Sequence, residues 1–223
     1  AGAFTTSGTL TEDTGTVEFN GGSQTIPSET FYDVSVNCTT ATLGASVIVG
    51  AGGTLTVEGT KTLALGSSTL TFQSGTMLEV DGTLTSAGGT LQSSGAGVYF
   101  ALDVDGTLNI NGLTINRPDD NGLTIHAAAT VTALDNVTFQ NGQNGGTSRY
   151  LRLEHASGSY TFTGHSIDAN CNENVQAPSG ATICMVNSSG AKGGTTNGEA
   201  NDGAVDGNIT WTSSNTWEGD DAT

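Results

Sequence analysis

The segment Gly53-Thr54-Leu55-Thr56-Val57 alternates polar and aliphatic residues directly after a glycine. Close variants of this segment follow at residues 75–80 (GTMLEV), 82–84 (GTL) and 106–110 (GTLNI). Each one would place aliphatic side chains on one face and Thr, Asn or Glu on the other, which is the period-two pattern of a β-strand. Glycines between such segments favour turns. The sequence therefore predicts many short strands joined by tight turns.

Aliphatic residues also recur at a longer interval of 21 to 24 residues. They form three columns: Leu55, Leu78, Leu102 and Ile125; Leu63, Leu84, Leu108 and Val131; and Leu70, Leu91, Ile115 and Val137. A repeat of this length is typical of one solenoid turn, and three columns indicate three strands per turn. We therefore predict an all-β protein, a right-handed single-stranded parallel β-helix of about seven turns. A β-sandwich is the alternative, but it would not require a constant offset between columns.

The repeat breaks after Asp168. We expect a β-helix body over residues 1–168, a loop excursion over residues 169–207, and a closing strand with a C-terminal tail over residues 208–223, all in one domain. Cys171 and Cys184 flank a polar stretch, and we expect a disulfide between them to close the excursion. Reduced thiols are the alternative. Cys38 lies within a strand pattern and is expected in the core.

The chain is strongly acidic, with 5 Lys and Arg against 22 Asp and Glu and a formal net charge of -17. Binding of nucleic acid depends on clustered cations, so this composition argues against a nucleic-acid partner. No apolar run approaches the roughly 18 residues of a membrane-spanning helix, so no transmembrane segment is predicted. The expected disulfide favours an extracellular or cell-surface location.

The N-terminal third carries a more specific pattern. Residues 15–26 (GTVEFNGGSQTI) lead into residues 30–37 (TFYDVSVN), and residues 198–211 (GEANDGAVDGNITW) form an acidic segment near the other end. The chain resembles secreted bacterial surface proteins of the repetitive right-handed parallel β-helix type, in which such segments precede the G-T-L turns and close the module. The resemblance implies the fold and the surface location. It implies little about activity, because few activities are assigned in such families.

Only a few residues match the groups that carbohydrate-cleaving enzymes use. Arg117-Pro118-Asp119-Asp120 is the best candidate for a polysaccharide lyase, which needs a base beside acidic Ca²⁺ ligands. Asp119, Asp120 and His165 distantly resemble a hydrolase pattern, but its further elements are missing. The three histidines are too far apart for a ligand motif and are expected at the surface or beside strands. We predict that the protein is not an enzyme and has no catalytic residues.

Two further kinds of site are open. Asp103 and Asp105, and Asp202 and Asp206, could supply oxygen ligands to Ca²⁺ in turns; otherwise they are solvated carboxylates, and no other cofactor is expected. The sequence also contains four sequons for N-glycosylation, which lie at Asn37, Asn136, Asn187 and Asn208.

The ends of a β-helix expose backbone groups that can pair with another chain. We therefore expect a non-catalytic extracellular structural protein, either a subunit of a self-assembling filament or a cell-surface stalk module, that forms homo-oligomers through its ends or terminal strands. Phe4, Trp211 and Trp217 are expected at these ends. The alternative is an adhesin that presents a Thr/Asn face, hinted at by Thr54-x-Thr56 and Thr83-x-Thr85, or an aromatic loop to glycans or ice. A polysaccharide lyase or hydrolase is less favoured.

Overall fold

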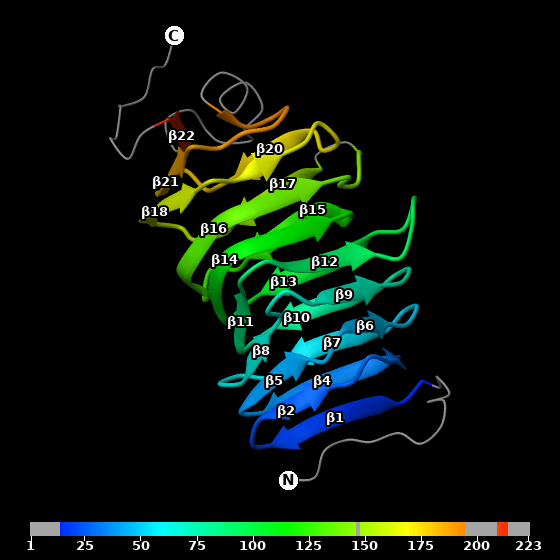
Figure 1. The fold of residues 1–223 in the computed structure, drawn as a ribbon. Helices are drawn as coiled ribbons and strands as arrows, with labels where there is room; N and C mark the ends of the chain where they lie inside the picture. The colour runs from blue at the N-terminus through cyan, green and yellow to red at the C-terminus, as the bar shows by residue number, and fades with distance from the viewer. Residues whose placement is uncertain (1–13, 146–147, 195–208, 214–223) are drawn as a thin grey trace.

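The short strands predicted from the Gly-Thr segments coil around one axis as a β-solenoid. The computed structural model describes residues 14–145, 148–194 and 209–213. Strand succeeds strand from the N-terminal to the C-terminal end, and every pairing between strands is parallel (Figure 1). None of the described segments forms a helix long and apolar enough to cross a membrane.

The first face of the coil is a sheet of eight strands. Neighbouring strands in it are one turn apart, so the eight strands span seven turns. In spatial order they are β1 (Thr16–Gly21), β4 (Asp33–Cys38), β7 (Thr54–Val57), β10 (Met77–Val80), β13 (Phe100–Val104), β15 (Pro118–Ile125), β17 (Arg149–Leu153) and β20 (Glu173–Gln176).

The second and third faces share one sheet because two long strands turn the corner between them. β14 (Thr107–Asn116) pairs with strands of both faces, and β16 (Thr130–Gln140) pairs along its length with β14. Below them, the second face holds β2 (Gln24–Ile26), β5 (Thr40–Leu43), β8 (Thr62–Ala64) and β11 (Thr83–Ser86). The third face holds β3 (Thr30–Phe31), β6 (Ser46–Val49), β9 (Thr69–Phe72), β12 (Gly89–Ser93) and, beyond β16, β19 (Ser166–Ile167).

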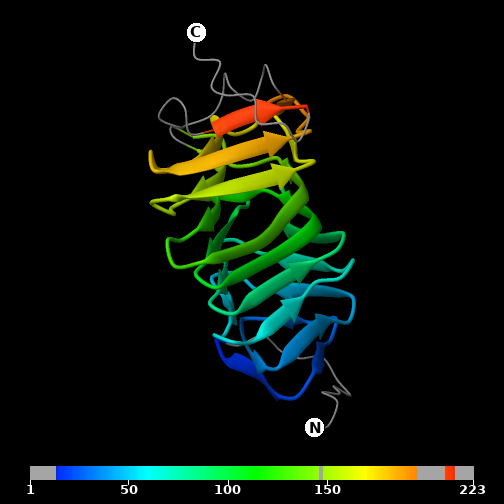
Figure 2. The same ribbon diagram turned by 90° about the vertical axis from the view of Figure 1, so that its left-hand side faces the viewer.

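A separate sheet follows at the C-terminal end. It consists of β18 (Gly158–Thr163), β21 (Ala181–Val186) and β22 (Ile209–Thr212), in that order. Figure 2 shows β22 in red, laid across the top of β21 and β18.

Most of the predicted columns are confirmed by the pairing register. Leu55, Leu78 and Leu102 lie directly above one another, and so do Leu63, Leu84, Leu108 and Val131. These aliphatic side chains, except that of Val131, are buried. Because each fully buried Leu contributes about 1.5–3 kcal/mol, the stacked interior stabilises every turn through its neighbours.

Two column assignments were wrong by two residues. Leu123, and not Ile125, lies opposite Leu102, and the register here is irregular, since the four residues 119–122 of β15 face the single residue Ala101 of β13. Phe139, and not Val137, lies opposite Ile115, and one residue of this difference comes from an extra residue that β16 carries opposite the step from Leu108 to Asn109. Insertions of this kind are β-bulges.

The predicted loop excursion at 169–207 was also wrong in its described part. β20 pairs with β17, and β21 pairs with β18, so the coil continues through this stretch. Stacking requires only that inward residues be apolar, and Val175, Ile183 and Met185 meet that condition without the Gly-Thr signature.

The predicted disulfide is absent, since Cys171 and Cys184 are both free and buried. β20 of the first face lies between them in the sequence, and Cys184 belongs to β21 in the C-terminal sheet, so the two thiols sit on different sides of the coil. Cys38 is buried in β4, as expected. Of the predicted end residues, Trp211 lies in β22 with 5% of its surface exposed, while Phe4 and Trp217 fall outside the described residues.

Candidate functional site

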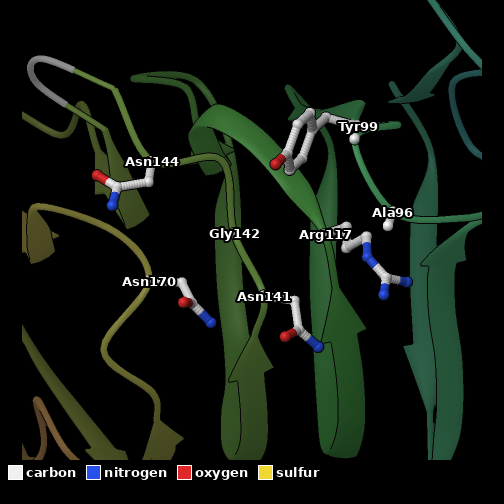
Figure 3. A pocket seen from close by; sticks show the side chains of 8 residues that line it. Ala96, Tyr99, Arg117, Asn141, Gly142, Asn144 and Asn170 are labelled. Carbon is white, nitrogen blue, oxygen red and sulfur yellow. The ribbon is translucent and has the colours of Figure 1, made fainter.

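A shallow polar groove runs along the corner where the third face passes into the first. It has a volume of about 260 Å³ (Figure 3). The corner segments of successive turns line it, namely those between β12 and β13, β14 and β15, β16 and β17, and β19 and β20. The lining residues are Ala96, Gly97, Tyr99, Arg117, Asn141, Gly142, Asn144 and Asn170.

The backbone is turned sharply at the floor of this groove. Arg117 has a φ of 65° and Asn141, at the equivalent corner one turn later, has a φ of 54°. The amide N–H of Arg117 donates to the carbonyl oxygen of Gln140 at 2.9 Å. Left-handed backbone is tolerated by Asn but is unusual for a long side chain such as Arg, and such residues concentrate at functional sites.

Asp168 holds one wall of the groove in place. Its Oδ2 accepts hydrogen bonds from the backbone N–H of Asn141 at 2.6 Å and from Nδ2 of Asn170 at 2.7 Å. Its Oδ1 accepts a hydrogen bond from the hydroxyl of Tyr150, which in turn accepts the N–H of Gly142 at 3.0 Å. Burial and the hydrogen bond to Asp168 raise the pKa of Tyr150, so this phenol stays protonated as a donor. The wall is therefore rigid before any ligand arrives.

Glycine is required at one point of this wall. A Cβ atom at Gly142 would lie 2.4 Å from Sγ of Cys171 and 2.6 Å from Cε1 of Tyr150. The backbone of Gly142 therefore packs directly onto these two buried side chains, and the groove surface follows their positions.

Several polar groups in the groove have no partner among the described residues. They are the guanidinium of Arg117, the hydroxyl of Tyr99 and the side-chain amide of Asn144. Figure 3 shows Tyr99 and Arg117 on one side and Asn144 and Asn170 on the other, with Asn141 and Gly142 between them. The arrangement offers hydrogen-bonding groups and one cation to a small polar ligand.

A second feature is an acidic strip on the outer side of the first face. Glu58, Asp81 and Asp105 follow the aligned residues Val57, Val80 and Val104 on successive turns, and Glu79 and Asp103 are neighbours one column away. The Coulomb repulsion between such closely spaced carboxylates is partly relieved by neighbouring donors. Thr56 Oγ1 donates to Oε2 of Glu79 at 3.3 Å, and Ser35 Oγ donates to Oε1 of Glu58 at 2.9 Å.

The predicted calcium ligands lie partly in this strip. Asp103 Oδ1 is 3.6 Å from Nε2 of His126, so this carboxylate already has an imidazole as a partner. Within residues 14–145, 148–194 and 209–213 no group of three or more His, Cys, Asp or Glu side chains is arranged to hold a metal ion. Asp202 and Asp206 lie outside the described residues.

The residues considered for catalysis are spread over different parts of the coil. Asp119 lies in β15 of the first face, where its Oδ1 accepts the N–H of Asn121 at 2.9 Å and burial raises its pKa. His165 lies between β18 and β19, fully buried against Phe139 and Phe162, with ring centroids at 5.9 and 6.1 Å. His165 and His155 thus lie beside strands, the second of the two expected positions, but both are buried, His155 with 8% of its surface exposed.

Three of the four sequons lie within the described residues. Asn37, Asn136 and Asn187 are exposed, and Asn208 lies outside the described part of the chain. Asn37 Nδ2 donates to Oε1 of Glu18 at 2.8 Å, and Asn136 Nδ2 donates to Oδ1 of Asn111 at 2.8 Å. Glycosylation would replace one of the two hydrogens on each Nδ2, and it stays a prediction.

Outward threonines form one ladder on the second face, the face on which the ice-binding alternative would need a regular Thr array. On the second face Thr40, Thr62, Thr83, Thr107 and Thr130 are paired in register from turn to turn. The neighbouring column on that face alternates between residue types, with Thr42, Ala64, Thr85, Asn109 and Ala133. The face therefore carries one complete threonine column and not a regular double array.

Comparisons of this chain with protein-family models, with curated proteins and with solved structures gave no match. The resemblance to secreted bacterial β-helix proteins accordingly stays a prediction. The fold defines the class of protein as a β-solenoid, and we infer its function from the geometry described above.

Proposed function

We propose that this β-solenoid is a non-catalytic structural module of an extracellular surface, either a stalk module or a filament subunit, that joins end to end with copies of itself. We also propose that the coil is right-handed, as parallel crossover connections nearly always are. The unbroken ladder of the first face, from β1 to β20, is the observation that supports the proposal. Seven turns of about 4.8 Å would give a rod of roughly 34 Å along this face.

The N-terminal edge of the first face can accept another strand. The carbonyl oxygens of Gly15 and Gly21 in and beside β1 accept N–H groups of the next turn, Asp33 at 3.4 Å and Thr39 at 3.0 Å. Since backbone groups alternate in direction along a strand, those of Thr16, Glu18 and Asn20 point away from β4. Among the described strands β1 pairs only with β4, and an open edge of this kind favours addition of a second chain.

The experiment compares the full chain with two variants at Glu18. Glu18→Pro removes an outward N–H and places a ring on the edge, whereas Glu18→Gln keeps the N–H and serves as the matched control. We expect light scattering of the wild type and of Glu18→Gln to show growth with protein concentration, and electron micrographs to show rods. Glu18→Pro should remain monomeric with an unchanged circular dichroism spectrum. A wild type that stays monomeric at every concentration and shows no rods overturns the proposal.

A further inference from the structure

We propose that the corner groove between the third and first faces binds an acidic sugar, a uronic acid residue of a polysaccharide, with Arg117 as the carboxylate receptor and Tyr99 and Asn144 as contacts to the ring and its hydroxyls. This activity goes beyond the structural role proposed above and does not depend on it. The volume of about 260 Å³ lies just below the range of about 300–1,000 Å³ usual for small-molecule sites, which suits a single sugar residue.

The three arginines differ in whether their guanidinium groups have partners. Arg149 Nη1 donates to Gln176 at 2.6 Å, and Arg152 Nη2 donates to Glu154 at 2.9 Å. Arg117 has no such partner among the described residues, although the chain contains 22 Asp and Glu. A guanidinium offers a planar fork that matches a carboxylate in two parallel hydrogen bonds. The groove therefore presents the one arginine that no described carboxylate occupies.

The remaining lining groups match the other parts of a sugar. Tyr99 is half-buried, so one part of its ring can pack against the C–H face of a pyranose while its hydroxyl stays free to hydrogen-bond. The amide of Asn144 can donate to one hydroxyl and accept from another. Asn141 Nδ2 donates a hydrogen bond to Oδ1 of Asn116 at 3.0 Å, so Oδ1 of Asn141 is the atom that can accept a hydrogen bond from the sugar.

The groove is organised in advance of binding. The backbone at Arg117 and Asn141 is fixed in the left-handed region, and Asp168 fixes Asn141 and Asn170 by hydrogen bonds of 2.6 and 2.7 Å. A site that is already in its bound shape loses less conformational entropy on binding. Arg117 therefore presents its side chain from a strained backbone position.

The test is a titration of the full chain, at low ionic strength, with a trimer of galacturonic acid and with a trimer of galactose as the neutral match. Calorimetry and amide chemical-shift mapping should show saturable binding of the acidic trimer, with shifts at the groove residues, and binding of the neutral trimer at least tenfold weaker. Arg117→Asn removes the cation but keeps a residue that tolerates a positive φ, so the fold should survive.

We expect Arg117→Asn to weaken binding of the acidic trimer at least tenfold, while its melting temperature stays close to that of the wild type. Arg152→Gln removes a paired arginine outside the groove and should leave binding unchanged. Tyr99→Ala should weaken binding of both trimers. No saturable binding by the wild type, equal affinity for the two trimers, or unchanged affinity in Arg117→Asn overturns the proposal. Assembly into rods is measured separately, so its failure does not affect this result.

Discussion

Nδ1 of His126 lies 2.8 Å from Oε2 of Glu154, which occupies the equivalent position one turn further along the first face. Nε2 of the same imidazole lies 3.6 Å from Oδ1 of Asp103 on the preceding turn. The ring thus connects carboxylates of different turns across the acidic strip. Protonation of His126 converts both contacts into ion pairs.

This contact predicts a pH-dependent contribution to stability. Burial opposes the charged form of His126, but the hydrogen bond with Glu154 and the charges of Asp105, Glu154 and Asp103 outweigh it and raise the pKa of His126 above its ordinary value. The folded state therefore binds this proton more tightly than the unfolded state does. The stabilisation is present below about pH 6.5 and is lost as pH rises through the folded-state pKa.

We expect His126→Gln to lower the free energy of unfolding at about pH 5.5 by up to about 1 kcal/mol, a small value because the side chain is partly exposed. The difference from the wild type should shrink towards about pH 8.5. Urea denaturation of both proteins over this range measures it. A difference that does not change with pH contradicts the prediction.

For His165 we expect the opposite dependence of stability on pH. Burial lowers the pKa of His165 to about 4, and its Nε2 is buried without a hydrogen-bond partner among the described residues. The unfolded chain takes up a proton at about pH 6.5, whereas the folded chain resists it, so stability is complete above about pH 6.5 and falls as pH decreases to about 4. The loss should reach a few kcal/mol.

His165→Phe replaces the imidazole by a ring that matches its neighbours Phe139 and Phe162. We expect this variant to lose less stability than the wild type between about pH 6.5 and 4. Thermal denaturation at a series of pH values provides the comparison, and His126→Gln serves as a control that keeps the acid-labile histidine. Parallel pH profiles for the wild type and His165→Phe would show that His165 titrates alike in the folded and unfolded states, which contradicts the prediction.

At Gly106 the backbones of two successive turns are in close contact. A Cβ atom there would lie 1.9 Å from the carbonyl oxygen of Gly82 and 2.5 Å from that of Asp81, both on the preceding turn. Because backbone cannot move aside as a side chain can, Gly106→Ala should lower the free energy of unfolding by about 1–3 kcal/mol. Gly59, which has open space around it, is the matched control, and Gly59→Ala should change stability by less than about 0.5 kcal/mol. Equal effects of the two substitutions would count against this contact.

The free thiols give a chemical test of the fold. Cys38, Cys171 and Cys184 are buried, and burial raises the pKa of Cys171 to about 12, so little thiolate is available. We expect no reaction of the native protein with a thiol reagent on mixing, reaction of three thiols after unfolding, and no change in melting temperature on addition of a reductant. A single reactive thiol in the unfolded, unreduced chain would indicate the Cys171–Cys184 disulfide after all.

The architecture could be predicted from the sequence because inward residues repeat in a fixed register. Leu55, Leu78 and Leu102 stack as the spacing indicated. The predicted interval failed at Ile125, because the register between β13 and β15 is irregular and Leu123 is the residue opposite Leu102. The sequence did not indicate that the coil continues through β20 and β21, because these two strands lack the Gly-Thr pattern of the earlier turns.

The candidate site could not be predicted in the same way. Tyr99, Arg117, Asn141 and Asn170 come from four corners that lie between the aliphatic columns, and the spacing of those columns does not indicate how the corner residues meet. Only Arg117 stood out in the sequence, and it did so for its neighbours Asp119 and Asp120, which are not part of the groove lining. The one available signal was length, since the segments near Tyr99 and Asn144 are longer than the tight turns elsewhere.

The four residues 119–122 that face Ala101 alone illustrate how this architecture absorbs change. Leu102 is still aligned with Leu123, and Leu123 with Leu151 on the next turn, while Asp120 and Asn121 are exposed to solvent. A coil of this kind can gain or lose material at its corners independently of its scaffold. Engineering new recognition into the protein would accordingly be a matter of grafting loops beside Tyr99 and Asn144, with the stacked strands left as they are.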